Sequence, residues 1–232
     1  VGSEMCIRDR CFDATYPQNK ESIKYLRSLN VKKVKFLVNI KFSENKYQLE
    51  DTVNSKIKNF LKNKKFWCAA STHDNEEIIC ANVHLKLKKR VKNLVTFIIP
   101  RHTQRTEDIV NSFRDLDLKV HCHSSKENIR KDTDIYIVDT YGETNIFYNL
   151  SNIVFLGGSI INRGGQNPLE PARLGCKILH GPYIHNFKEI YSFLKKIKIA
   201  TKFTNESSLS QIINNKIVTR SKKKNKLLSN IG

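Results

Sequence analysis

An apolar strand, two glycine pairs and a helix start follow one another within residues 155–175, and this order limits the folds open to the chain. The pairs 157–158 and 164–165 permit a tight turn and the close approach of a ligand. Asn167 then suits a helix N-cap, with Glu170 as the carboxylate of a capping box. Free N–H groups and the positive helix end would meet there, so we expect an anion-binding turn. The alternative is that the glycines only turn the chain and Glu170 only caps its helix.

The rest of the chain alternates between apolar runs and amphipathic stretches. Expected strands cover 65–70, 94–99, 118–122, 134–138, 152–156 and 177–180, and expected helices cover 49–62, 75–90, 105–115, 143–150, 168–174 and 186–196. Such alternation indicates βαβ units. The runs 66–70 and 95–99 are apolar throughout, which is typical of strands covered on both faces. We therefore predict an α/β fold, a Rossmann-like parallel sheet with helices on both faces.

The ends of the chain differ from this central region. Residues 1–10 resemble the translated remnant of a sequencing adapter, and we treat them as an artefact outside the fold. A helix is expected over 15–29 and a strand over 33–40. We expect residues 11–42 to be separate from a domain at 43–218, and the basic stretch 219–232 to be a solvated tail.

Charge and cysteine usage narrow the possible partners. The 232 residues carry 41 Lys and Arg against 22 Asp and Glu, a formal net charge of +19, which favours polyanions such as nucleic acid, anionic lipid or phosphorylated substrates. A coding bias toward lysine is the alternative. No apolar run approaches the roughly 20 residues that span a bilayer. The six cysteines form no Cys-x-x-Cys pair and indicate reduced thiols. We expect no metal at His121-Cys-His123, because consecutive strand residues point to opposite faces.

Polar residues gather where a parallel sheet binds ligands. Residues 71–73, 101–105 and 139–143 each follow the carboxyl end of an expected strand, as residues 157–170 do. Because those ends meet at one edge, the four loops should line a single crevice. The alternative for each loop is local: a helix cap at 71–72, solvated arginines at 101 and 105, and a turn at 139.

These motifs together resemble the 3-deoxy-D-manno-octulosonic acid (Kdo) transferases. The resemblance runs from about Asn39 to Lys188 and rests on their order and spacing. The matching segments are Phe66-Trp-Cys-Ala-Ala-Ser-Thr-His73 with Glu76-Glu77, Pro100-Arg-His102 with Arg105, Asp139-Thr140 with Gly142-Glu143, Gly157-Gly-Ser159, Arg163-Gly-Gly165, Asn167-Pro-Leu-Glu-Pro171, Gly181-Pro182 and Asn186-Phe187.

The resemblance implies the C-terminal, nucleotide-sugar-binding domain of a GT-B glycosyltransferase, spanning 43–218, with 11–42 as the end of an acceptor domain and the crossover from it. The implied enzyme is inverting: it transfers Kdo from CMP-Kdo to a lipid A precursor in lipopolysaccharide biosynthesis, without a metal or other cofactor. The implied donor-binding residues are Ser71, Thr72, His73, Arg101, His102, Arg105, Gly142, Glu143, Gly158, Ser159, Arg163, Gly164, Gly165, Asn167 and Glu170.

The resemblance also implies what this chain does not contribute. The glutamate that acts as general base and the membrane-associating segment are expected in an N-terminal domain, so no catalytic base is assigned here. We expect an N-terminally truncated fragment that binds CMP or CMP-Kdo weakly and transfers nothing. The intact enzyme would lie on the cytoplasmic face of the bacterial inner membrane, near anionic lipid. The alternatives are a GT-B enzyme with another donor, or a basic nucleic-acid-binding module, for which no reader motif is present.

Overall fold

The computed structural model describes residues 14–17, 20–31, 33–35 and 55–218. They fall into two compact units, one within Val1–Gln48 and one within Leu49–Leu228. In the smaller unit, helix α2 (Lys20–Ser28) lies in the chain between Thr15 and Val34, which form a parallel bridge. The helix predicted from residue 15 therefore begins later. The predictions for residues 1–10, 36–54 and 219–232 lie outside the described residues.

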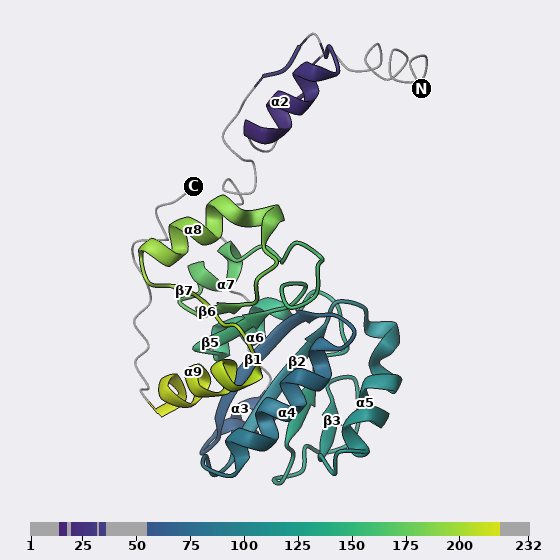
Figure 1. Ribbon diagram of the computed structural model, residues 1–232. Coiled ribbons are helices and arrows are strands. Elements are labelled where there is room, and N and C mark those ends of the chain that lie inside the picture. Colours follow the sequence, from purple (N-terminus) through teal and green to yellow (C-terminus); the bar gives the residue numbers. More distant parts are fainter. Residues whose placement is uncertain (1–13, 18–19, 32, 36–54, 219–232) are drawn as a thin grey trace. The chain divides into compact units, whose positions relative to one another are not determined.

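The larger unit is built on a seven-stranded sheet in which every neighbouring pair is parallel (Figure 1). The strand order is β3-β4-β2-β1-β5-β6-β7. This arrangement confirms the predicted Rossmann-like sheet. The strands are β1 (Lys65–Thr72), β2 (Leu94–Pro100), β3 (Val120–Cys122), β4 (Ile135–Ile137), β5 (Ile153–Leu156), β6 (Lys177–His180) and β7 (Ala200–Lys202).

Helices connect all consecutive strands except β3 and β4, and most lie where the sequence predicts them. They are α3 (Ser55–Leu61), α4 (Glu76–Lys88), α5 (Thr106–Arg114), α6 (Thr144–Leu150), α7 (Leu169–Arg173), α8 (Lys188–Lys196) and α9 (Glu206–Val218), with short 3-10 turns η2 (Thr103–Arg105) and η3 (His185–Phe187). The sequence predictions missed β7 and α9. Strand β7 has only three residues, Ala-Thr-Lys, whereas α9 buries Leu209, Ile213 and Ile217 on one face against the core.

Both faces of the sheet are buried, which explains the continuously apolar strands. Trp67 and Ala69 of β1 face a core formed with α4, α5 and α9. Phe97 of β2 lies on the other face, in edge contact with Tyr136 and with Phe147 of α6, at centroid separations of 5.6 and 5.1 Å. Ile98, the neighbour of Phe97 in β2, belongs to the first core, so adjacent residues of one strand fill two cores.

A buried polar cluster ties α4 to β2 and β4. His84 Nδ1 lies 2.9 Å from Thr96 Oγ1, and its Nε2 lies 3.5 Å from Asp134 Oδ1. Lys88 Nζ contacts the same Asp134 oxygen at 2.5 Å. Burial raises the pKa of Asp134, but hydrogen bonds from His84, Lys88 and the Lys119 N–H outweigh it and lower the pKa to about 2.

This lowered pKa predicts an acid-sensitive contribution to stability. The unfolded carboxyl titrates near 3.9, so the contribution is complete above about pH 4 and is lost as the pH falls toward 2. We expect the free energy of unfolding of the wild type to fall more between pH 5 and pH 2 than that of Asp134→Asn, measured by urea denaturation. Parallel pH profiles for the two proteins would contradict the assignment.

Candidate functional site

The sheet reverses its strand order at β1 and β5, and the predicted site residues lie around that point. From β1 the chain runs through α4 to β2 on one side, whereas β5 leads to β6 on the other. A crevice opens at the carboxyl edge of such a reversal. The loops after β1, β2, β4 and β5 carry the predicted residues, so the parallel sheet places them all on this edge.

A buried carboxylate, Glu76, joins the two strands at the reversal. Its Oε2 accepts the N–H of His73 at 3.1 Å and of Gly158 at 2.7 Å. Its Oε1 accepts the N–H of Ser159 at 3.2 Å and of Ile160 at 2.9 Å. The side chain is fully buried. Four backbone donors therefore compensate one buried negative charge and fix the loop after β5 to the start of α4.

This network corrects the sequence prediction for Gly158 and Ser159. Both residues were predicted to bind the donor, and their N–H groups bind the protein's own carboxylate. The physical reason is that buried backbone donors require a partner, and Glu76 supplies one within the fold. The Ser159 hydroxyl is likewise engaged: it donates to Leu156 O at 2.6 Å and accepts from Gly181 N at 2.9 Å. Ser159 is thus a structural link between β5 and β6.

Gly157 allows this close contact between strands. A Cβ at this position would lie 2.3 Å from the Ser71 carbonyl oxygen and 2.8 Å from Glu76 Oε2. Ser71 itself has a φ of +54° at the irregular end of β1, before the fully buried Thr72. The Thr72 carbonyl accepts the Arg101 N–H at 2.9 Å. Residues 71 and 72 therefore shape the backbone of the crevice.

The second glycine pair holds the loop against the segment after β6. Gly165 donates its N–H to Gly158 O at 2.8 Å, so this donor too is used within the protein, contrary to the sequence prediction. Gly164 has a φ of +86°, and a Cβ there would lie 2.2 Å from Asn186 Nδ2. Asn167 Oδ1 accepts the N–H of Leu169, the first residue of α7, at 3.1 Å, whereas the N-cap position falls on Pro168, one residue later than predicted. Glu170, in the first turn of α7, is half-buried.

Cationic side chains from three loops meet beside Gly158. A Cβ on Gly158 would lie 3.4 Å from both His73 Cδ2 and Arg163 Cβ, so these residues border the same space. The His73 and His102 rings are 5.8 Å apart. Burial and then the neighbouring charges of His102, Arg163, Arg101 and Arg105 lower the pKa of His73.

This cluster of basic side chains, named the cationic cluster for its two arginines, consists of His73, Arg101, His102 and Arg163 and can receive an anion. Arg101, His102 and Arg163 are exposed. The buried Nε2 of His73 has no hydrogen-bond partner among the described residues. A phosphate or carboxylate here would gain charge-assisted hydrogen bonds from the arginines. The exposed arginines therefore supply positive charge at this site, whereas the predicted Gly165 N–H is used within the protein.

Arg105 is placed differently from the prediction. Its guanidinium contacts Glu77 Oε1 at 3.1 Å and Asp74 Oδ1 at 3.0 Å. Burial raises the pKa of Glu77, while the hydrogen bonds from its own backbone and from Arg105 lower it. A buried carboxylate needs a compensating cation. Arg105 therefore holds η2 against α4, and its expected direct contact with a ligand phosphate is not supported.

The loop after β4 forms a second polar cluster on the same edge. Glu143 accepts a hydrogen bond from Thr140 Oγ1 and lies 3.2 Å from His123 Nε2. His123 Nδ1 lies 2.8 Å from the Tyr136 hydroxyl. Gly142, with a φ of +84°, is exposed beside it. The described contacts link Glu143 to the β3 side of the edge, not to the cationic cluster.

The sequence analysis missed two members of this second cluster. His123 bridges Tyr136 and Glu143, and Ser124 donates its N–H and hydroxyl to the Asp139 carboxylate at 2.9 and 2.5 Å. Both follow the carboxyl end of β3, and this position in the sequence could have identified them as candidate site residues. The described residues contain no group of three or more His, Cys, Asp and Glu side chains suited to a metal ion.

Comparisons with known proteins agree with this geometry. No family model matches the chain. It is 31% identical over 137 residues to 3-deoxy-D-manno-octulosonic acid transferase of Haemophilus influenzae, covering 59% of this chain and 32% of that protein. It is 29% identical over 202 residues to the Rickettsia bellii enzyme of the same name, covering 87% and 48%. The chain thus spans half or less of the length of these two curated relatives.

The fold of this chain is also similar to that of a solved structure. The C-terminal CMP-Kdo binding domain of WaaA from Acinetobacter baumannii superposes with a TM-score of 0.66 at 26% identity. The match covers 73% of this chain and 88% of that domain.

The parallel sheet and its strand order have the fold of a GT-B glycosyltransferase domain. Within that class, the chain matches the C-terminal half of a Kdo transferase.

Proposed function

We propose that this chain is the donor-binding half of a Kdo transferase and that the cationic cluster receives CMP-Kdo. The observation that carries the proposal is the convergence of His73, Arg101, His102 and Arg163 at the strand reversal. CMP-Kdo presents a phosphate and a sugar carboxylate, and both need positive partners. The CMP-Kdo binding domain of WaaA has the same fold, which supports this choice of donor.

The proposed reaction is an inverting transfer to a lipid A precursor. A glucosamine hydroxyl oxygen of the acceptor forms a bond to the anomeric carbon of Kdo, the bond from that carbon to the CMP phosphate oxygen breaks, and CMP leaves. Arg101 and Arg163 would stabilise the negative charge that grows on the leaving phosphate. We propose a metal-independent reaction, because these side chains supply the charge. The hydroxyl proton passes to a base that no residue of this chain is assigned to provide.

The proposal includes the cellular location of the whole protein. Among the described residues, no helix combines the length and hydropathy needed to cross a bilayer. We propose that the full enzyme works at the cytoplasmic face of the inner membrane, where its lipid acceptor resides. The formal charge of +19 would favour an anionic membrane surface.

A calorimetric titration of the chain with CMP, UDP, GDP and short single- and double-stranded DNA tests the donor assignment. We expect CMP to bind more tightly than UDP or GDP. A preference for UDP would reject CMP-Kdo in favour of another donor. Tight, steeply salt-dependent DNA binding without a CMP response would indicate a nucleic-acid-binding module.

Glu170 provides a prediction about the nucleotide. We propose that its carboxylate accepts from the ribose hydroxyls, so Glu170→Ala should weaken CMP binding about tenfold, the loss of one hydrogen bond to a charged group. Urea denaturation of Glu170→Ala measures the change in stability separately from the change in CMP affinity. Asn167→Ala is the matched variant and should cost about 1 kcal/mol of stability. A large stability loss in Glu170→Ala, with CMP affinity retained, would assign the carboxylate a structural role.

A further inference from the structure

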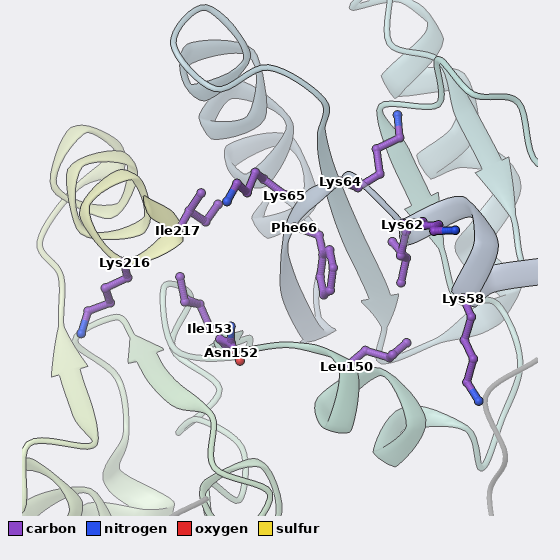
Figure 2. Close-up of a pocket in the computed structure, with 11 residues that line it drawn as sticks. Lys58, Lys62, Lys64, Lys65, Phe66, Leu150, Asn152, Ile153, Lys216 and Ile217 are labelled. Carbon is purple, nitrogen blue, oxygen red and sulfur yellow. The ribbon is translucent and has the colours of Figure 1, made fainter. Parts of the chain in front are cut away.

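A pocket lies at the opposite edge of the sheet, where the strands begin (Figure 2). Strands β1 and β5 start there, and the C-terminal ends of α3, α6 and α9 contribute to its wall. Its lining residues are Lys58, Leu61, Lys62, Lys64, Lys65, Phe66, Leu150, Asn152, Ile153, Lys216 and Ile217. None of them belongs to the loops of the donor site, so this lysine-rimmed pocket is a separate feature.

The floor of the pocket is apolar. Leu61, Ile153 and Ile217 are buried, whereas Phe66 and Leu150 remain half-exposed. Phe66 is held by an edge contact with Phe97, with ring centroids 5.5 Å apart. Figure 2 shows its ring above Leu150. The half-exposed side chains can therefore bury further apolar surface against a ligand.

Lysines surround this floor without a single acidic side chain among the lining residues. Figure 2 shows the ammonium groups of Lys58, Lys62 and Lys216 directed outward around the apolar side chains. Lys64 is held at the rim, where its ammonium donates to Lys131 O at 2.5 Å. Burial and then the nearby charge of Lys177 lower the pKa of Lys216, as expected where positive charge is concentrated.

Lysines near helix C-termini can also serve only to neutralise the negative ends of the helices. This explanation can be tested by comparing the charge of the helix ends with the charge of the lysines. Each helix end contributes about half a negative charge. Three helix ends therefore offset only a minor part of five lysine charges. The pocket keeps a clear positive excess, and its partner should combine an anion with an apolar group.

We propose that the lysine-rimmed pocket binds an acidic phospholipid of a membrane. The lipid phosphate would lie at the rim, beside ammonium groups such as that of Lys62, and the first part of an acyl chain would contact Phe66 and Leu150. Each lysine near an anionic surface contributes about 1 kcal/mol of attraction. This inference does not depend on the identity of the sugar donor, which binds at the other edge.

Vesicle flotation of the 232-residue chain tests the inference, with phosphatidylcholine vesicles and with phosphatidylcholine mixed with phosphatidylglycerol. The pocket variant carries Lys58→Glu, Lys62→Glu and Lys65→Glu. The control variant carries Lys188→Glu, Lys195→Glu and Lys196→Glu on the exposed side of α8. We expect the pocket variant to lose at least about tenfold in affinity for the acidic vesicles, and the control, with the same change in net charge, about threefold or less.

Two further measurements separate a pocket from diffuse charge attraction. Leu150→Asn leaves the charge unchanged and should weaken vesicle binding about threefold or more, through lost apolar contact. Inorganic phosphate at equal ionic strength should not compete. Equal losses in the pocket and control variants, or full competition by phosphate, would overturn the inference. CMP binding by the same variants reports separately on folding and on the donor site.

Discussion

Glu76→Ala is expected to lower the free energy of unfolding by at least about 3 kcal/mol, because each buried N–H left without an acceptor costs about 1–3 kcal/mol. The change leaves four backbone N–H groups without their acceptor: those of His73, Gly158, Ser159 and Ile160. Glu76→Gln should have a smaller effect, because its carbonyl oxygen still accepts one pair of donors while its NH₂ opposes the other. Urea denaturation of the three proteins measures the series.

The matched control is Glu107→Ala. Glu107 is also an acid in the first turn of a helix, α5, but it is exposed. Its loss should cost only the 0.3–1 kcal/mol of a helix-dipole interaction. In the folded fraction, Glu76→Gln should also bind CMP at least about tenfold more weakly, because the loop that positions Arg163 is no longer fixed. Equal losses of unfolding free energy in Glu76→Ala and Glu107→Ala would contradict this account. Glu76 would then contribute no more than the helix-dipole interaction of an acid in the first turn.

The second large effect is expected from the exposed arginines of the cationic cluster. Arg101→Ala and Arg163→Ala should each weaken CMP binding about tenfold, and the double variant about a hundredfold, since a hydrogen bond to a charged group contributes about 1.5–3 kcal/mol. The melting temperatures should stay close to the wild-type value, because both side chains are exposed. Isothermal titration calorimetry at two salt concentrations measures the affinities for CMP and the electrostatic contribution to the binding free energy.

Arg90→Ala provides the control for lost charge. Arg90 is exposed just after α4, close to the start of β2 and away from the carboxyl edge. Its loss should leave CMP affinity within about twofold, as expected for a screened distant charge. Equal weakening by Arg90→Ala and Arg163→Ala would mean that net charge, and not the cluster, attracts the nucleotide.

The sequence predicted the fold well because its signals are local. Continuous apolar runs marked β1 and β2, and amphipathic stretches marked the helices between the strands. Strand β7 was missed because Ala200-Thr-Lys202 is too short to form a pattern. Helix α9 does carry a signal, because Leu209, Ile213 and Ile217 recur at helical spacing and are buried in the core, but this spacing was not used in the prediction.

The site was harder to predict because its key contact is remote in sequence. The loops were placed correctly, since parallel strands bring their carboxyl ends to one edge. However, Glu76 bonds to N–H groups 82 to 84 residues away, and in the sequence it reads only as a first-turn helix acid. The same limit applies to Arg105, whose partners Asp74 and Glu77 lie on another loop and helix.

The most direct test of the donor-site assignment is an amide chemical-shift titration of the isotopically labelled chain with CMP. We predict the largest changes at residues 71–73, 101–105 and 163–167, around the reversal between β1 and β5. Changes confined to the other edge of the sheet, around residues 62–66 and 150–153, or no saturable change at all, would contradict the account.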